Sequence, residues 1–298
     1  MKVFVTGATG YLGGSISHKL IEQGHEVLGL VRTAEQAAQL EQRGISALIG
    51  TLDDAGALHK GATESDATIN AANSDHFFSI QTLISSLKGS GKTLIHTSGT
   101  SIVCDDAKGE FASEAIFQDD TPFEPQLHRG GRVRIDQLVR SAGIHDGIRA
   151  FVICPSMVYG TGLGLRKDSD QLPKLVKQSQ AVGAGVFIGK GATVWSNVYI
   201  SDLADLYVQA LDNAPSGAFF FAENGESTFQ QIAEAVHAAL GFKGETRSWP
   251  YDEAVEALGP FARVALATNA RVRATNARKL LGWAPTGPDL REALIRGV

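Results

Sequence analysis

Cysteine is scarce in this chain of 298 residues, which contains only Cys104 and Cys154. Two cysteines exclude a disulfide framework as the source of stability, and neither they nor the histidines show metal-ligand spacing. No apolar run reaches the roughly 18 residues of a membrane-spanning helix, and the apolar stretch at the N-terminus is too short for a signal peptide. We therefore expect a cytoplasmic protein that holds no metal and does not enter a membrane.

Positive charge is not in excess either. The chain has 27 lysines and arginines against 32 aspartates and glutamates, which gives a formal net charge of −5. A nucleic-acid-binding surface normally needs a basic patch, and no run of five like charges occurs that could form an electrostatic tail. We therefore expect no nucleic-acid partner.

Short apolar strands and helical stretches alternate in the first half of the chain. Strands are expected at residues 3–5, 26–31, 45–49, 67–71, 93–96 and 149–153. Helices are expected at residues 13–23, 34–42, 76–87 (with Asp75 as N-cap) and 133–141, and later at 171–180, 202–212 and 228–240. This alternation predicts an α/β fold with a doubly wound parallel sheet of six or seven strands and helices on both faces.

Glycine is abundant, with 33 residues where average usage of about 7% would give roughly 21. Three of them, Gly7, Gly10 and Gly13, follow the first expected strand and open the first expected helix. Such a loop lets the backbone approach a pyrophosphate, and the helix N-terminus supplies free N–H groups for the phosphates. A plain turn with a helix cap is the alternative. The position of the loop after a strand and before a helix favours dinucleotide binding.

Five segments in order carry a resemblance to a known family: residues 6–13, 95–99, 155–160, 195–202 and 279–285. Together they resemble the extended short-chain dehydrogenase/reductase family, with its nucleotide-sugar epimerase and dihydroflavonol-reductase relatives. The resemblance implies a Rossmann domain at residues 1–160, completed by 192–222. It also implies a smaller C-terminal substrate-binding domain at residues 161–191 and 223–298, and often a homodimer.

The same resemblance implies which residues bind the dinucleotide. Carried over position by position, they are Gly7, Thr9, Gly10, Tyr11, Leu12, Gly13, Arg32, Leu52, Asp53, Ala71, Ala72, Asn73, Pro155, Met157 and Val158. One position departs from the family, because Thr51 stands where an adenine-side aspartate is usual and Asp53 is a possible substitute.

The end of the second expected strand indicates which dinucleotide is bound. NAD-specific sites usually place a carboxylate there for the ribose hydroxyls. Here the strand ends at Arg32, and no carboxylate occurs before Glu35. An arginine can hold a 2′-phosphate through a charge-assisted, fork-like contact. We therefore predict NADP as the cofactor, with a solvated strand-end arginine as the alternative.

The catalytic pattern of the family is missing. No Tyr-x-x-x-Lys motif occurs in the chain, and the aligned tyrosine and lysine positions fall on His128 and Arg132. The family serine falls on or next to Gly99, which leaves Ser98, Thr100 and Ser101 as neighbouring hydroxyls. We predict His128 as the acid or base, Arg132 as a charge-stabilising group, and Ser98 or Thr100 as carbonyl-orienting groups. The alternatives are a loop histidine with a helix-cap arginine, or Tyr159 as the proton donor.

Three functions remain open. The first is an NADP(H)-dependent oxidoreductase acting on a carbonyl or hydroxyl group of a small molecule, with a non-standard active site. The second is a catalytically silent NADP(H)-binding sensor or regulatory protein, and the third is a sugar-nucleotide-type epimerase or dehydratase. A substrate domain of normal length favours the enzyme, because a sensor needs no closed cleft.

Overall fold

Seven parallel strands form the central sheet of the computed structural model, which describes residues 1–296. Their order across the sheet places β4 beside β1, so the chain reverses its direction of winding at that point. From edge to edge the strands are β11 (Phe219–Ala222), β7 (Arg149–Pro155), β5 (Thr93–Thr97), β4 (Ala67–Asn70), β1 (Lys2–Thr6), β2 (Glu26–Val31) and β3 (Ser46–Ile49). This topology confirms the predicted doubly wound Rossmann sheet.

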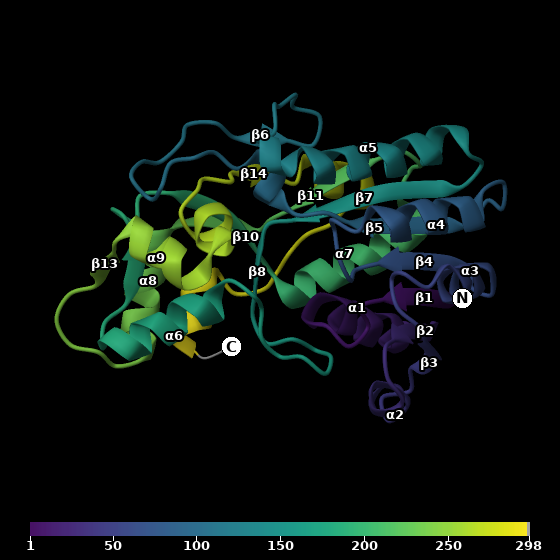
Figure 1. The fold of residues 1–298 in the computed structure, drawn as a ribbon, viewed down its shortest axis with the longest axis horizontal. Helices are drawn as coiled ribbons and strands as arrows, with labels where there is room; N and C mark the ends of the chain where they lie inside the picture. The colour runs from purple at the N-terminus through teal and green to yellow at the C-terminus, as the bar shows by residue number, and fades with distance from the viewer. Residues whose placement is uncertain (297–298) are drawn as a thin grey trace.

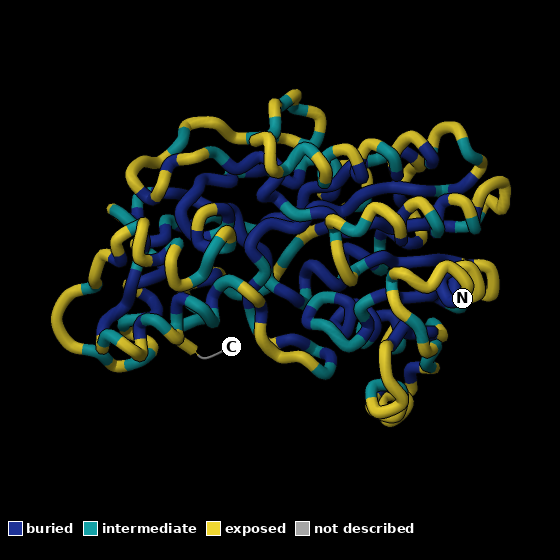
Figure 2. The backbone as a smooth tube through the Cα atoms, viewed as in Figure 1, coloured by how far each residue is buried: buried dark blue, intermediate teal, exposed yellow. Residues whose placement is uncertain are grey.

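Alternation along β1 explains why helices cover both faces of the sheet. Phe4 packs in one apolar cluster, whereas Val3 and Val5 pack in another, because successive strand residues point to opposite faces. The Phe4 face is covered by α3 (Ala55–Thr63), α4 (Phe77–Leu87) and α5 (Gly130–His145). The opposite face is covered by α1 (Tyr11–Glu22), α2 (Ala34–Glu41) and α7 (Ile200–Asn213), and the buried strands lie between these layers (Figures 1 and 2).

Several helices differ from the sequence prediction, among them α3 and α4. The N-cap of α4 is His76, whose Nδ1 accepts a hydrogen bond from the backbone N–H of Ser79 at 3.2 Å. The prediction of Asp75 as N-cap is therefore wrong, because its carboxylate is held by Arg132 instead. Helix α3 is absent from the prediction, because the short stretch Ala55–Thr63 carries two glycines and little apolar periodicity.

The remaining elements gather beside the large sheet (Figure 1). Three small sheets pair β8 (Met157–Tyr159) with β10 (Val194–Tyr199) and β12 (Gly225–Thr228), β9 (Val186–Ile188) with β13 (Arg247–Trp249), and β6 (Phe117–Gln118) with β14 (Val272–Arg273). The helices are α6 (Leu172–Val182), α8 (Phe229–Ala239), α9 (Tyr251–Leu258), α10 (Thr275–Leu281) and α11 (Leu290–Arg296). Helix α10 packs against β11 and α7 of the Rossmann layers, so it crosses the domain division predicted at residue 223.

Within residues 1–296, no helix is long and apolar enough to cross a membrane. The same residues contain no group of three or more histidine, cysteine, aspartate or glutamate side chains placed to hold a metal ion.

Candidate functional site

The glycine loop lies tightly folded at the carboxyl edge of the sheet. Gly7 adopts φ +79°, and a Cβ there would come within 2.9 Å of the Ala71 carbonyl oxygen after β4. A Cβ on Gly13 would come within 2.3 Å of the Gly7 carbonyl oxygen. The N-cap of α1 is Gly10, with no side-chain cap and no acidic residue in the first turn. The first N–H groups of α1 are therefore left for an anion, as a phosphate site requires.

A cavity of about 320 Å³ opens beside this loop. It is lined by Gly7, Thr9, Gly10, Leu30, Val31, Arg32, Gln36, Gly50, Thr51, Leu52, Ala71 and Ala72. Sequence reasoning named seven of these residues as binding residues and missed the others. Gln36 could have been identified from its spacing of one helical turn from Arg32. Together the close-packed glycines and this cavity fit the adenosine half of a dinucleotide.

The residues that line this cavity include one cation, Arg32, and no carboxylate. Arg32 is exposed, and its backbone N–H donates to Gln36 Oε1 at 2.9 Å, which fixes the turn into α2. The hydroxyl of Thr33 caps α2 by accepting from the Gln36 N–H. Asp53 does not line the cavity, and its carboxylate lies 3.3 Å from His76 Nε2.

The other predicted cofactor residues lie around the loop without lining this cavity. The Tyr11 hydroxyl donates to the Gly160 carbonyl oxygen at 2.7 Å, which ties α1 to the chain after β8. Asn73 Oδ1 accepts from the Asp75 N–H in a local turn after β4. Leu12, Gly13, Pro155, Met157 and Val158 lie at the start of α1 and in β7–β8, and Met157 and Pro155 are buried.

Arg132 reaches the carboxyl end of β5, as the predicted charge-stabilising group should. Its guanidinium makes a bidentate contact with Asp75, at 2.9 Å from Nε to Oδ1 and 2.6 Å from Nη2 to Oδ2. Nη1 donates to Ser101 Oγ at 3.1 Å and lies 3.1 Å from the position of a Cβ on Gly99. Sequence reasoning missed Asp75 as a site residue, because nothing in the local pattern links it to a helix 57 residues later.

His128 lies on the short turn η2 (Leu127–Arg129), directly before α5, with its side chain exposed. Partial burial, reinforced by the charges of Arg129 and Arg263, lowers its pKa below the ordinary value of 6.5, while Asp106 opposes the shift. The imidazole is therefore mainly neutral near pH 7. In that state it accepts a proton more readily than it donates one.

The hydroxyl groups of Thr100 and Tyr159, both predicted as site groups, differ in their hydrogen bonding. Thr100 is buried in η1 (Thr100–Val103), and its Oγ1 has no hydrogen-bond partner among the described residues. Tyr159 is 1% exposed, and its hydroxyl donates to the Pro288 carbonyl oxygen at 2.6 Å. Burial raises the Tyr159 pKa far above its ordinary range, so this phenol holds its proton.

Ser98 belongs to a buried chain of polar side chains beneath the carboxyl edge. Thr6 Oγ1 donates to Asn70 Oδ1 at 2.6 Å, so the Asn70 amide nitrogen is left to donate to His96 Nδ1 at 3.2 Å. His96 then carries its hydrogen on Nε2, which lies 3.6 Å from Asp136 Oδ1, and neither of these two atoms has a hydrogen-bond partner among the described residues. Ser98 Oγ donates to the other carboxylate oxygen of Asp136 at 2.7 Å. Strands β1, β4 and β5 and helix α5 are thereby linked at the edge that carries the site.

Asp136 is the acidic residue in this set of buried polar side chains, and sequence reasoning missed it. Burial raises its pKa to about 7, against the opposing effects of Ser98 and Arg132. Burial also lowers the pKa of His96 to about 3, so that imidazole is neutral. Asp136 further lines a cavity of about 600 Å³ that runs between α5 and β11. Its place one helical turn after Arg132 was the available signal.

Replacing Asp136 by asparagine should reduce the dependence of stability on pH. Folding raises the Asp136 pKa from 3.8 to about 7, so the folded state binds this proton more tightly than the unfolded chain does. The tighter proton binding stabilises the folded state fully below about pH 4, and this stabilisation disappears as pH rises through 7. The wild type should lose roughly 2–4 kcal/mol more stability than Asp136→Asn between pH 4 and 8. Urea unfolding at both pH values measures this, with exposed Asp120→Asn as control; equal losses would contradict it.

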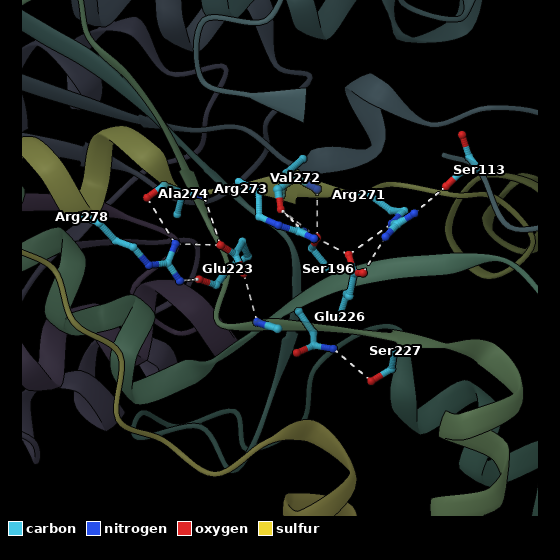
Figure 3. Close-up of polar contacts among 12 residues, drawn as sticks. Ser113, Ser196, Glu223, Glu226, Ser227, Arg271, Val272, Arg273, Ala274 and Arg278 are labelled. Carbon is cyan, nitrogen blue, oxygen red and sulfur yellow. Dashed lines mark hydrogen bonds and ion pairs between the residues drawn. The ribbon is translucent and has the colours of Figure 1, made fainter. Parts of the chain in front are cut away.

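Three arginines near the C-terminal end of the chain, Arg271, Arg273 and Arg278, are paired with carboxylates. Arg271 Nη2 lies 2.7 Å from Glu226 Oε1, and Arg273 Nη1 lies 3.0 Å from Glu226 Oε2 (Figure 3). Arg278 Nη1 lies 2.7 Å from Glu223 Oε1. Glu223 directly follows β11 and Glu226 lies in β12, so these ion pairs tie the region of β14 and α10 to the end of β11 and to β12.

Comparisons with known proteins agree with this architecture. The family model described as NAD dependent epimerase/dehydratase family matches residues 3–220. The chain is 33% identical to the oxidase ucsJ of an Acremonium species over 98% of its own length and 95% of the relative's. It is 23% identical to the 2-alkyl-3-oxoalkanoate reductase of Stenotrophomonas maltophilia, over 81% of its length and 76% of the relative's.

Solved structures show the same fold at lower sequence identity. A UDP-glucose 4-epimerase from Thermotoga maritima superposes with a TM-score of 0.78 at 17% identity, over 99% of this chain and 96% of that one. A dTDP-glucose 4,6-dehydratase from Bacillus anthracis, solved in complex with NAD, gives 0.78 at 14% identity, over 99% and 94%. With the glycine loop and the doubly wound sheet, these matches show that the chain belongs to the NAD dependent epimerase/dehydratase family and is an NAD(P)-dependent enzyme of the oxidoreductase type.

Proposed function

We propose that the protein is an NADP(H)-dependent oxidoreductase that interconverts a carbonyl and a hydroxyl group on a small molecule. The observation that carries the proposal is the dinucleotide cavity, in which Arg32 is the charged lining residue and no carboxylate lines the ribose side. An exposed guanidinium suits a 2′-phosphate, whereas NAD would find no acid there for its ribose hydroxyls. Relatives named as an oxidase and as reductases support this class of reaction.

The dinucleotide, when bound, supplies or accepts the hydride. His128 then exchanges the proton with the substrate oxygen, taking it during alcohol oxidation and giving it during carbonyl reduction. Arg132 holds developing negative charge on that oxygen without titrating, and Asp75 and Ser101 fix its guanidinium in place. Ser98, held by Asp136, supports the end of β5. This arrangement replaces the missing tyrosine and lysine with a histidine and an arginine.

The alternative substrates of the family fit this chain less well. A nucleotide-sugar carries a diphosphate, which proteins commonly bind with unpaired arginines. Arg271, Arg273 and Arg278 are already matched by Glu223 and Glu226. A silent sensor would need neither the titratable His128 nor the fixed Arg132 beside β5. A small-molecule oxidoreductase is therefore the function that we propose.

Arg32→Ala should remove the preference for NADPH over NADH. The lost charge-assisted contact with the 2′-phosphate should weaken NADPH binding by about 10- to 100-fold and leave NADH binding nearly unchanged. Fluorescence titration of both dinucleotides measures this, with the exposed α5 variant Arg134→Ala as matched control. Equal wild-type affinities for the two dinucleotides, or an unchanged preference in Arg32→Ala, would overturn NADP as the cofactor.

A homodimer and a cytoplasmic location stay predictions. Phe77 and Phe78, at 49% and 43% exposure, lie at the start of α4, which the family resemblance places at a dimer interface together with α5. Sedimentation at micromolar concentration should give twice the chain mass of 31.6 kDa, and a monomer would reject the homodimer.

A further inference from the structure

We propose that Arg129 binds a carboxylate of the substrate, so that the substrate is a small oxo acid or the corresponding hydroxy acid. This inference rests on the proposed oxidoreductase function and names its substrate class. Arg129 is the N-cap residue of α5, three residues before Arg132 and one after His128. None of the sequence motifs singled it out.

Arg129 differs from the other partly buried arginines because its guanidinium hydrogen-bonds with the Cys104 sulfur and with no oxygen of the described residues. Five arginines are partly buried within residues 1–296: Arg129, Arg132, Arg149, Arg271 and Arg273. Four of them donate to a carboxylate or to backbone oxygens. The buried Nε atom of Arg129 has no hydrogen-bond partner among residues 1–296. No carboxylate within residues 1–296 forms an ion pair with Arg129. A partly buried cation without a counter-charge is costly, so an anion from outside the chain is the missing partner.

The surroundings of Arg129 place this anion at the reacting centre. The Cys104 thiol lies beside the guanidinium at the end of η1, and burial raises the Cys104 pKa, so the thiol stays neutral. Arg129 is the N-cap of α5, and Arg132 lies three residues later in the first turn of the same helix. Burial and the charge of Arg132 both lower the pKa of Arg129. Since Asp75 already neutralises Arg132, one positive charge remains open beside His128.

The single positive charge of Arg129, which no carboxylate pairs with, favours a carboxylate ligand over a phosphate ester. The planar fork of an arginine matches both oxygens of a carboxylate. A dianionic phosphate would bring a second charge close to Asp75, which is half-exposed and negatively charged. A carboxylate beside the reacting carbonyl would lie against Arg129 while the carbonyl oxygen lies against His128 and Arg132.

Acetoacetate and its neutral methyl ester provide a matched test, because they share the same oxo group and differ in the charge and one added methyl group. Calorimetric titration into the protein loaded with NADP⁺ measures binding without turnover, since the oxidised dinucleotide cannot reduce a ketone. Wild type should bind acetoacetate about 10- to 100-fold more tightly than methyl acetoacetate. Arg129→Gln should lose this preference and Arg129→Lys should keep part of it. The exposed control Arg134→Gln should behave as wild type.

Equal binding of acid and ester by wild type, or a preference that survives in Arg129→Gln, would overturn the assignment. Tighter binding of hydroxyacetone phosphate than of acetoacetate would overturn the carboxylate class. If Arg129→Gln does not fold, the preference for acid over ester in wild type is compared with that in Arg129→Lys. Arg129→Lys should keep only part of this preference, because lysine keeps the charge and loses the planar fork. Failure of the proposed function is separate: it would appear as acid-selective binding with no hydride transfer to any oxo acid.

Discussion

His128→Ala should lower kcat by roughly 10²- to 10⁴-fold and leave dinucleotide affinity nearly unchanged, because it removes the group that exchanges the proton and lies outside the dinucleotide cavity. Steady-state turnover of a panel of aldehydes, ketones and oxo acids measures kcat, and fluorescence titration measures the affinity. His145→Ala, at the exposed far end of α5, is the matched control.

The pH dependence sharpens this test. Because the His128 pKa lies below its ordinary value of 6.5, carbonyl reduction should slow as pH rises through that lowered pKa and the imidazolium is lost. Alcohol oxidation should speed up over the same range, because it uses the neutral imidazole. His128→Ala should remove the pH dependence of both reaction directions. Arg132→Ala should lower the rate and keep both pH dependences. Full activity in His128→Ala would transfer the role to another group, and an inactive wild type that binds NADPH would favour the sensor.

Gly13→Ala should abolish tight dinucleotide binding, with an affinity loss of at least about 100-fold. The added Cβ would lie 2.3 Å from the Gly7 carbonyl oxygen and 2.7 Å from the Gly7 carbonyl carbon. Both are backbone atoms, so no side chain can rotate away and the phosphate loop itself must move. Overpacking of this kind should also cost about 1–3 kcal/mol of the free energy of unfolding.

Dinucleotide titration and urea unfolding of Gly13→Ala measure both effects. Gly56→Ala is the matched control, because its Cβ would meet its nearest neighbour, Asp54, at an ordinary 3.4 Å within helix α3. That change should stabilise the protein by up to about 1 kcal/mol. Wild-type affinity in Gly13→Ala would show that the loop does not approach the phosphates closely.

Local patterns determined much of this molecule from the sequence. The alternation of short apolar strands with helices predicted a doubly wound parallel sheet of six or seven strands and located six of its seven strands, because strand and helix periodicities are properties of consecutive residues. The glycines at 7, 10 and 13 predicted the phosphate loop, since only glycine fits its close approaches. Arg32 was identified because it follows the second strand at the position where NAD-specific sites usually place a carboxylate, and it lines the cavity.

The polar partners of the site were decided by tertiary structure alone. Asp75 follows β4 and Arg132 lies in α5, so their ion pair forms only when the sheet brings β4 and β5 side by side. The pKa of Asp136 rises because tertiary packing buries its carboxyl group, and burial has no signature in a neighbouring residue. No motif of the sequence singles out Arg129, and its unpaired Nε is a property of the tertiary structure alone. Periodicity fixes the strands and helices, whereas charge pairing depends on distances between segments that are far apart in the chain.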